Sequence, residues 1–117
     1  MDRKQFLARF KELTVQMYET AERKNSDYSG NEDDPFKNFS MVETIGFASA
    51  EQGFLTRIID KVMRVSSFIK NGTLKVLDEK VTDTLCDLAN YAILMVIYLE
   101  SKKIKDETQT ARDIEGA

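Results

Sequence analysis

Apolar residues recur at helical spacing along most of this chain, with charged residues between them. In residues 2–24 they follow one face of a helix, at Phe6, Phe10, Leu13, Met17 and Ala21. Two further segments with this period lie between Phe54 and Leu99 and are separated by a short break at Asn71 and Gly72. A connection this short folds two successive helices back on each other. The pattern therefore predicts an all-α protein, a small bundle of about four helices organised around a helical hairpin.

Local signals predict what lies between the first helix and the hairpin. Residues 25–38 break the helical period and contain the only proline, so we expect one long loop there. Ser40 and Glu43 have the spacing of a capping box, which predicts a short helix over residues 41–45 that stops at Gly46.

The hairpin has recognisable ends of its own. Ser49 repeats the capping-box signal and starts the first helix, and Asp78 is the expected N-cap of the second helix. After Lys103 the apolar period is lost. We therefore expect a single helical domain over residues 1–103 and a flexible tail over residues 104–117.

Two charged stripes line the predicted hairpin. The first helix carries three cations at helical spacing, and the second carries acids and an amide at the same spacing. These residues are Arg57, Lys61 and Arg64 on the first helix, and Glu79, Asp83, Asp87 and Asn90 on the second. An antiparallel hairpin brings Arg64 level with Asp83 and Arg57 level with Asn90, so the stripes border one groove. We interpret this groove as the functional site.

The apolar stripe of the hairpin's first helix lies on a different face and is expected to form the core. It consists of Leu55, Ile58, Ile59, Val62, Val65 and Ile69. Phe54 and Phe68 are expected to flank the basic stripe instead of joining this core.

The last helix is apolar on nearly all sides from Leu88 onward. Ile93, Leu94 and Ile97 extend the same stripe that begins with Glu79 and Asp83. A bundle of this size can hardly cover a helix from every direction. We therefore expect a homo-oligomer whose subunits meet at the apolar half of the last helix.

The acidic stripe leaves two interpretations open. Carboxylates at successive i, i+4 positions repel each other by about 0.2–0.5 kcal/mol per pair, so a nearby cation should offset them. Salt bridges with the basic stripe would do this, and so would a magnesium ion held by carboxylates, water and substrate phosphates. The candidate metal ligands are Glu79, Asp83 and Asp87, joined by Glu43 or Asp60. Asp60 also has a simple partner in Arg64, four residues further on.

The predicted loop is unusual because aromatic residues lie among acids. Tyr28, Phe36 and Phe39 follow no apolar period, and Lys37 lies between two of them. Such residues either anchor the loop in the core or offer an aromatic face on which a base can stack. Both interpretations can hold for the same loop.

Composition excludes several kinds of chemistry. The chain of 117 residues has no histidine, which removes histidine-containing catalytic triads, histidine-ligated metals and histidine general bases. Its single cysteine, Cys86, excludes an intrachain disulfide and is expected in the core. A net charge of −3 provides no overall positive field for duplex nucleic acid. The N-terminus is unlike a signal peptide and the longest apolar run is about half a membrane span, so we expect a cytoplasmic protein without a membrane partner.

Several separated motifs resemble a known family. They are DYSGNEDDPFKNF, Glu43, Gly46, GFLTRIIDKVMR and VLDEKVTDTLCDLANYAIL, in this order over about residues 24–95. Together they are similar to the first type of nucleotide modification associated domain, which is frequent in bacteriophages. The resemblance implies a fold like that of the all-α NTP pyrophosphatases, the MazG-like helical bundles that oligomerise and hydrolyse nucleoside triphosphates with magnesium.

The chain departs from those enzymes at the metal ligands. They place a Glu-x-x-Glu pair on one helix and Glu-x-x-Asp on a later one. Asp87 matches the final aspartate, but Thr84 stands where the preceding glutamate is expected. Asp60, the nearest candidate for the other pair, is followed by Met63 instead of a second acid. What the resemblance retains is the nucleotide context and the phosphate-contacting cations.

Together these observations predict a protein that binds a phosphorylated nucleotide in the interhelical groove without turnover. The basic stripe would hold phosphates, and Asp83, Asp87 and Asn90 would orient those cations or contact ribose and base. The aromatic residues of the loop, with Lys37, would close the site. One candidate ligand is a cyclic dinucleotide signal of antiphage defence, which the protein would sequester. The alternatives are a magnesium-dependent nucleoside triphosphate pyrophosphohydrolase and a helical interaction module without a nucleotide.

Overall fold

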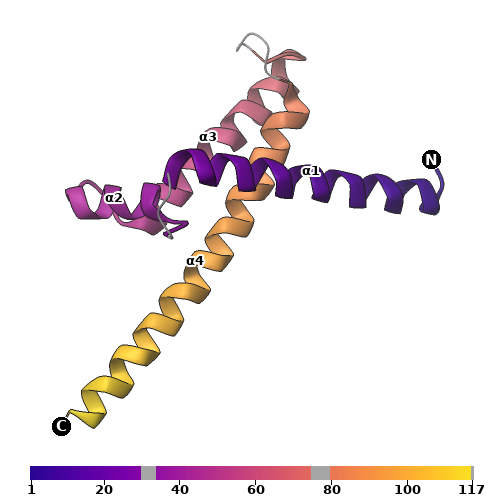
Figure 1. The fold of residues 1–117 in the computed structure, drawn as a ribbon. Coiled ribbons are helices and arrows are strands. Elements are labelled where there is room, and N and C mark those ends of the chain that lie inside the picture. The colour runs from indigo at the N-terminus through magenta and orange to yellow at the C-terminus, as the bar shows by residue number, and fades with distance from the viewer. Residues whose placement is uncertain (30–33, 75–79, 117) are drawn as a thin grey trace.

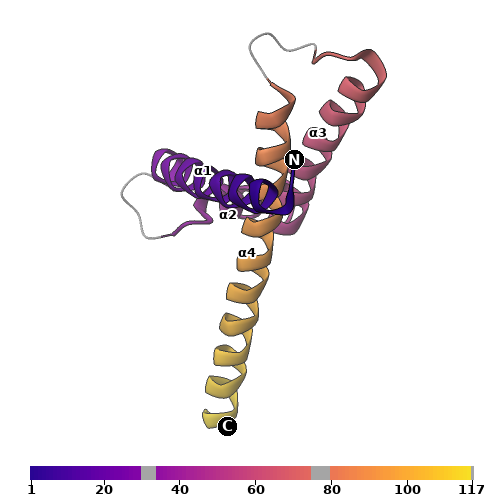
Figure 2. The same cartoon turned by 90° about the vertical axis from the view of Figure 1, so that its right-hand side faces the viewer.

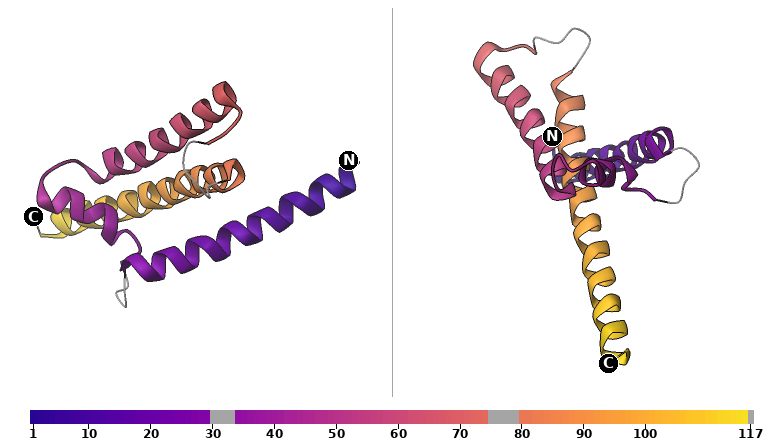
Figure 3. Two further views of the ribbon diagram at one scale, coloured as in Figure 1. Left: turned by 90° about the horizontal axis from the view of Figure 1, so that it is seen from above. Right: turned by 90° about the vertical axis from the view of Figure 1, so that its left-hand side faces the viewer.

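The computed structural model describes residues 1–29, 34–74 and 80–116, which form four α-helices (Figure 1). These are α1 (Arg3–Ser29), α2 (Lys37–Ile45), α3 (Ala50–Asn71) and α4 (Val81–Glu115). Those three ranges contain no β-strand. Helices α3 and α4 lie side by side as an antiparallel hairpin, α1 crosses α4, and α2 packs against α3 (Figures 1 and 3). The prediction of a small all-α bundle is confirmed.

Short-range signals correctly located two helix ends and one helix start. The Ser49 hydroxyl accepts from the Gln52 backbone N–H at 3.1 Å, and the Gln52 side chain accepts from the Ser49 N–H at 2.8 Å. This completes the predicted capping box of α3. Helices α2 and α3 end at Gly46 and Gly72, whose φ angles of 89° and 74° are left-handed. Glycine adopts this conformation without a steric cost, so both predicted stops are confirmed.

The end of α1 differs from the prediction. The helix continues through residues 25–29, where a loop was expected. The Asn25 side chain, a turn signal in the sequence, donates instead to the Pro35 carbonyl at 2.7 Å. Because the asparagine side chain is engaged in this long-range hydrogen bond, it does not bond to the nearby backbone, and the helix continues instead of forming a local turn. The same bond connects α1 to the segment before α2.

The start of α2 also differs. The helix begins at Lys37 and Ser40 lies inside it, so the predicted capping box at Ser40 is wrong. Asp34 is the cause, since its carboxylate accepts from the Phe36 backbone N–H at 2.9 Å and turns the chain one helical turn earlier. Asp78, the expected N-cap of the last helix, lies outside the described residues.

Helix α4 extends further than the sequence pattern predicted. It was expected to end near Lys103, but it continues to Glu115, so the segment expected to be an irregular tail is helical. These residues lack an apolar period but form local contacts, such as the 2.9 Å hydrogen bond from Gln109 to Asp113. A helix can therefore persist there without a core to pack on. Figures 1 and 2 show this part of α4 projecting away from the other helices.

The core is one aromatic cluster. Its buried members are Phe36, Phe39, Ala50 and Phe54, with Tyr91, Leu94, Met95 and Tyr98 packed against them. The rings of Phe39 and Phe54 stack with centroids 3.8 Å apart and planes 11° apart. The Tyr98 ring lies 5.4 Å from the rings of both Phe36 and Phe54. The cluster thus joins the segment before α2 to α2, α3 and α4, and it confirms that Phe36 and Phe39 anchor their segment in the core.

The predicted core on α3 requires correction. Phe54, expected beside the basic stripe, is fully buried, because α2 folds over the start of α3 and brings Phe39 onto it. The expected core stripe stays largely open, and several of its side chains are about half exposed or more. These are Leu55, Ile59, Val62 and Ile69. The described part of the chain does not cover this face of α3.

The N-terminal half of α1 and the middle of α4 expose apolar side chains as well. On α1 these include Phe6, Leu7 and Phe10, and on α4 they include Ile93, Val96 and Ile97. Figure 3 shows the N-terminal half of α1 extending beyond the hairpin. One side of the apolar half of α4 is therefore exposed in the described structure, while Leu94 and Met95 on the other side pack against the core.

By length and composition, α4 is the one helix in the described ranges that could cross a membrane. Core helices of soluble proteins meet the same criterion. The helix also contains Asp87, whose carboxylate pairs with lysines of two other helices. A charge inside a membrane span is rare and functional, whereas a paired charge is ordinary where helices pack on each other.

An ion pair fastens α4 to the first turn of α3. Lys102 Nζ lies 2.7 Å from Glu51 Oε1. The hydrogen bond from Lys102 lowers the pKa of Glu51 from its ordinary 4.5 and raises the pKa of Lys102 above its ordinary 10.5. Nearby, burial and then the negative charge of Glu51 raise the pKa of the Tyr98 hydroxyl.

We expect Phe54→Ala to destabilise the fold by about 3–5 kcal/mol, since it removes a fully buried ring from the centre of the cluster. Urea unfolding followed by far-UV circular dichroism measures this loss. Phe47→Ala is the matched control, because Phe47 is 85% exposed, and it should change stability little. Equal effects of the two substitutions would contradict a core centred on Phe54.

The Glu51–Lys102 pair predicts a pH dependence of stability. A lowered carboxyl pKa contributes stability above pH 4.5 that is lost as the pH falls through the folded-state pKa of Glu51. The raised pKa of Lys102 also contributes stability, and this contribution is lost in alkali, as the pH rises above 10.5 through the folded-state pKa of Lys102. Urea unfolding of wild type and Glu51→Gln should therefore differ at neutral pH and converge in acid, by a small amount that salt reduces. Glu107→Gln, an exposed change on the outer part of α4, should leave the pH profile unaltered.

Candidate functional site

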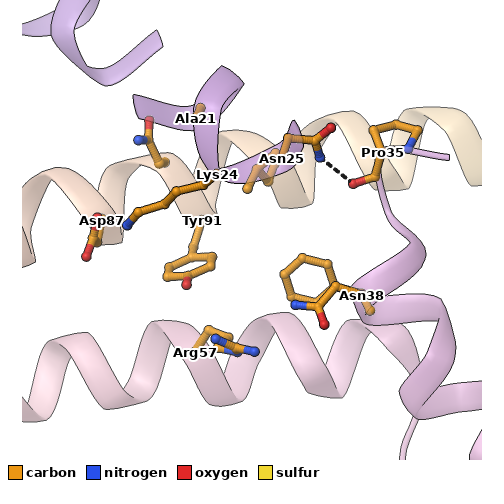
Figure 4. Close-up of a pocket in the computed structure, with 11 residues that line it drawn as sticks. Ala21, Lys24, Asn25, Pro35, Asn38, Arg57, Asp87 and Tyr91 are labelled. Atoms are coloured by element: carbon orange, nitrogen blue, oxygen red, sulfur yellow. Dashed lines mark hydrogen bonds and ion pairs between the residues drawn. The ribbon is translucent and has the colours of Figure 1, made fainter. Parts of the chain in front are cut away.

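A pocket of about 70 Å³ lies where the end of α1 meets α3 and α4 (Figure 4). Its polar lining residues are Lys24, Asn25, Asn38, Arg57, Asp87 and Asn90. Its apolar lining residues are Ala21, Pro35, Phe39, Tyr91 and Leu94. All four helices and the segment before α2 therefore contribute to one small hollow, most of whose wall is apolar.

Asp87 is the centre of the charges at this pocket. Its Oδ1 lies 3.1 Å from Lys24 Nζ of α1, and its Oδ2 lies 3.6 Å from Lys61 Nζ of α3. The side chains of Lys61 and Asp87 are only 13% and 21% exposed. Low exposure weakens solvent screening, so this pair interacts more strongly than a typical surface pair. One carboxylate thus connects three helices.

Arg57 adds a further cation to the same place. Figure 4 shows the Tyr91 ring projecting from α4 toward Arg57 on α3. The Arg57 side chain forms no hydrogen bond or ion pair with any residue in the part of the chain that the structure describes. Among the described residues, three cations, Arg57, Lys24 and Lys61, therefore lie at or beside this pocket together with one carboxylate, that of Asp87. These residues carry an excess of positive charge, in a chain whose net charge is −3.

Two amide side chains hold the walls of the pocket in place. Asn90 Nδ2 on α4 donates to the Met17 carbonyl of α1 at 3.2 Å. Asn25 of α1 donates to the Pro35 carbonyl, as described above. A carbonyl inside a helix normally accepts from the backbone N–H four residues further along. The additional bond from Asn90 to the Met17 carbonyl therefore marks a close approach of α1 to α4. The position of α1 is thus determined by hydrogen bonds at the site itself.

The structure brings part of the predicted site together. Phe39, Arg57, Asp87 and Asn90 line the pocket, and Lys61 adjoins it through Asp87. Arg57 and Asn90 meet across one hollow, as the antiparallel hairpin predicted.

The other predicted residues lie elsewhere. Arg64 Nε is 3.3 Å from Asp60, the simple pair that the sequence suggested. Asp83 lines a separate cleft between α1 and α4, and Phe36 lies in the core. Lys37 is half-buried and does not line the pocket. Glu79 and the side chain of Tyr28 lie outside the described part of the chain.

The candidate metal ligands do not form a site among the described residues. Asp83 and Asp87 lie one turn apart on α4, but no three His, Cys, Asp or Glu side chains in those ranges gather closely enough to hold an ion. Asp60 and Glu43 therefore do not join them. Asp60 is paired with Arg64, and the charge of Glu43 acts on Tyr98 at the other end of the hairpin.

Sequence reasoning missed the contribution of α1. Lys24 and Asn25 both line the pocket, although the analysis of charges considered only the hairpin. A signal was present, since Lys24 and Asn25 continue the apolar stripe of Met17 and Ala21 at i+3 and i+4. Polar residues on the packing face of a helix need partners, and these find Asp87 and the Pro35 carbonyl.

Fold and site define a small all-α protein with a cation-rich interhelical pocket. Residues 48–99 match the family model of nucleotide modification associated domain 1, so the resemblance found in the sequence is confirmed for this segment. The matched residues include Arg57, Lys61, Asp87 and Asn90, whereas Lys24 lies outside them. The comparisons with curated proteins and with solved structures gave no match.

A double-mutant cycle can test the charges around Asp87. We expect Lys61→Met and Asp87→Asn to show a coupling energy of about 1 kcal/mol in urea unfolding, because the two groups are poorly solvated. Asp87→Asn alone should destabilise more than Lys61→Met, since it leaves both lysines without their carboxylate. The exposed Asp60–Arg64 pair provides the matched control cycle, with an expected coupling of about 0.3–0.5 kcal/mol. A Lys61–Asp87 coupling no larger than the control would show that the pair is effectively solvated.

Proposed function

We propose that this protein binds a phosphorylated nucleotide at the pocket around Arg57 and Asp87, without turnover. The observation that carries the proposal is the excess of cations at a largely apolar hollow. A nucleotide combines both properties, since it joins negatively charged phosphates to a base with apolar faces and a polar edge. The domain name matched by residues 48–99, which refers to nucleotide modification, is in keeping with this ligand class.

Each group at the pocket has a role in such a complex. Arg57 presents a planar fork of donors that suits a phosphate or the acceptor edge of a base. Tyr91 and Phe39 supply aromatic surface, although one face of Phe39 is already stacked on Phe54. Asn38 supplies an amide at the mouth of the pocket. Such side chains bind by position and charge and need no chemical step.

Binding without turnover is the simpler proposal for the residues in view. The described residues, which do not include Glu79, contain no group of three acidic side chains, and holding a ligand is the simplest use of the charges at the pocket. The alternative, a magnesium-dependent pyrophosphohydrolase, draws its support from Asp83 and Asp87, which lie one turn apart on α4. A protein that only sequesters its ligand, such as a cyclic dinucleotide signal, needs a binding surface and no group that performs a chemical step.

We further propose that the protein acts as a homo-oligomer through the apolar half of α4. Support comes from the exposed side chains of that half, which include Ile93, Val96 and Ile97, and from the open apolar stripe of α3. Isolated exposed apolar residues are normal, but contiguous faces of this extent mark contact surfaces. A second copy of the chain carries the same faces and can cover them symmetrically.

Thermal unfolding with a ligand panel tests nucleotide binding. The panel comprises mononucleotides, nucleoside triphosphates and cyclic dinucleotides, each with magnesium and with EDTA. A ligand at 100 times its dissociation constant should add about 2.7 kcal/mol and raise the Tm by several degrees. Arg57→Ala should abolish most of this shift, and Arg112→Ala, an exposed arginine on the outer part of α4, should preserve it.

The outcomes separate the candidate functions. A shift that persists in EDTA, with the ligand recovered intact, supports sequestration. Product that forms only with magnesium would overturn binding without turnover and favour the hydrolase. If no nucleotide shifts the Tm, the charges around Asp87 serve to join helices and the interaction module is the better account.

A further inference from the structure

A second hollow adjoins the pocket. The cleft between α1 and the start of α4 has a volume of about 310 Å³. Its walls carry Arg9, Gln16, Thr20 and Arg23 from α1, facing Thr82 and Cys86 from α4. Lys24, Asp87 and Asn90 line both this cleft and the pocket. These three residues therefore form a partition between the two spaces.

Size shows that the pocket alone does not hold a nucleotide. Its volume is about 70 Å³. Sites for small molecules typically enclose roughly 300–1,000 Å³. The pocket and the cleft together reach that range.

The Lys24 side of this partition can open at low cost. Lys24 is 47% exposed and reaches Asp87 with a long flexible side chain. When Lys24 turns toward a ligand, Asp87 keeps Lys61 as a partner at 3.6 Å. The carboxylate is therefore not left buried and unpaired, which is the costly outcome for a buried charge.

The two spaces differ in chemistry. The pocket wall is mainly Ala21, Pro35, Phe39, Tyr91 and Leu94, which suits the faces of a base and disfavours a phosphate dianion. The cleft is open to solvent and offers hydroxyls, an amide and cations. Arg9 in the cleft is already paired with Glu12 at 2.9 Å. Arg23 is exposed and also lines the cleft, so its guanidinium faces the same solvent-filled space.

We propose that the nucleotide spans both spaces, with its base entering the pocket across the opened partition and its phosphates in the cleft on Arg23 and Lys24 of α1. This inference rests on the proposed function and assigns phosphate binding to α1, instead of the basic stripe of α3. Arg57 then contacts the base or its sugar. Asp83 on the opposite wall repels phosphate, which keeps the phosphates on the α1 side of the cleft.

Titrations with ATP, GTP and their nucleosides test this arrangement. Arg23→Ala should weaken triphosphate binding about tenfold, as expected for the loss of a charge-assisted contact, and leave nucleoside binding unchanged. Arg57→Ala should weaken both. Arg3→Ala, an exposed arginine near the start of the same helix, is the matched control and should change neither.

Cys86 provides an independent readout, because it is the only cysteine in the chain and lines the cleft. Saturating ATP or GTP should slow its alkylation by N-ethylmaleimide severalfold in wild type, and much less in Arg23→Ala at the same concentration. If a triphosphate binds in an Arg57-dependent way but neither Arg23→Ala nor Cys86 alkylation responds, the arrangement is overturned and the proposed function stands. If no triphosphate, no nucleoside and no other member of the ligand panel binds, both this arrangement and the proposed function are overturned.

Discussion

The stacked rings of Phe39 and Phe54 are the interaction on which the rest of the structure depends. They lie at the centre of the aromatic core, and Phe36 and Tyr98 complete the contact among α2, α3 and α4. Aromatic rings bury more area than any other side chains, so a small number of them can hold several elements together. Phe39 also lines the pocket, which means that the candidate site is built directly on the core.

Local sequence signals predicted the helices well, and tertiary contacts explain where they failed. The capping box at Ser49 and the glycine stops depend on neighbours a few residues away, and sequence reports such contacts reliably. Residues 25–29 became helical because Asn25 finds a partner ten positions along, at Pro35. Phe54 was misplaced for a related reason. Periodicity shows which residues share a face of α3, but it does not show that α2 covers the opposite face.

The candidate site was predictable on the hairpin and not beyond it. Arg57, Asp87 and Asn90 are neighbours because an antiparallel turn brings those positions level, and that geometry follows from spacing alone. The contribution of Lys24 follows from the crossing of α1 over α4, which no local pattern specifies. Only the polar interruption of the apolar stripe on α1 pointed to it. A charged residue that interrupts an apolar helix face is thus a better indicator of a site in a helical bundle than a charged residue that belongs to a charged stripe.

Helix α1 has two separate surfaces along its length, so assembly through one of them and binding at the other would be coupled. Its C-terminal turns wall the pocket and the cleft, while its N-terminal half extends outward with Phe6 and Phe10 exposed (Figure 3). A rigid helix transmits a tilt from one end to the other. If the assembly proposed through α4 also engages the outer half of α1, the angle that it imposes on α1 also sets the width of the cleft. A ligand that favours the angle found in the assembly then strengthens assembly. Assembly strengthens ligand binding by the same factor, because the coupling between two equilibria is reciprocal. The apparent affinity for the ligand would therefore depend on protein concentration.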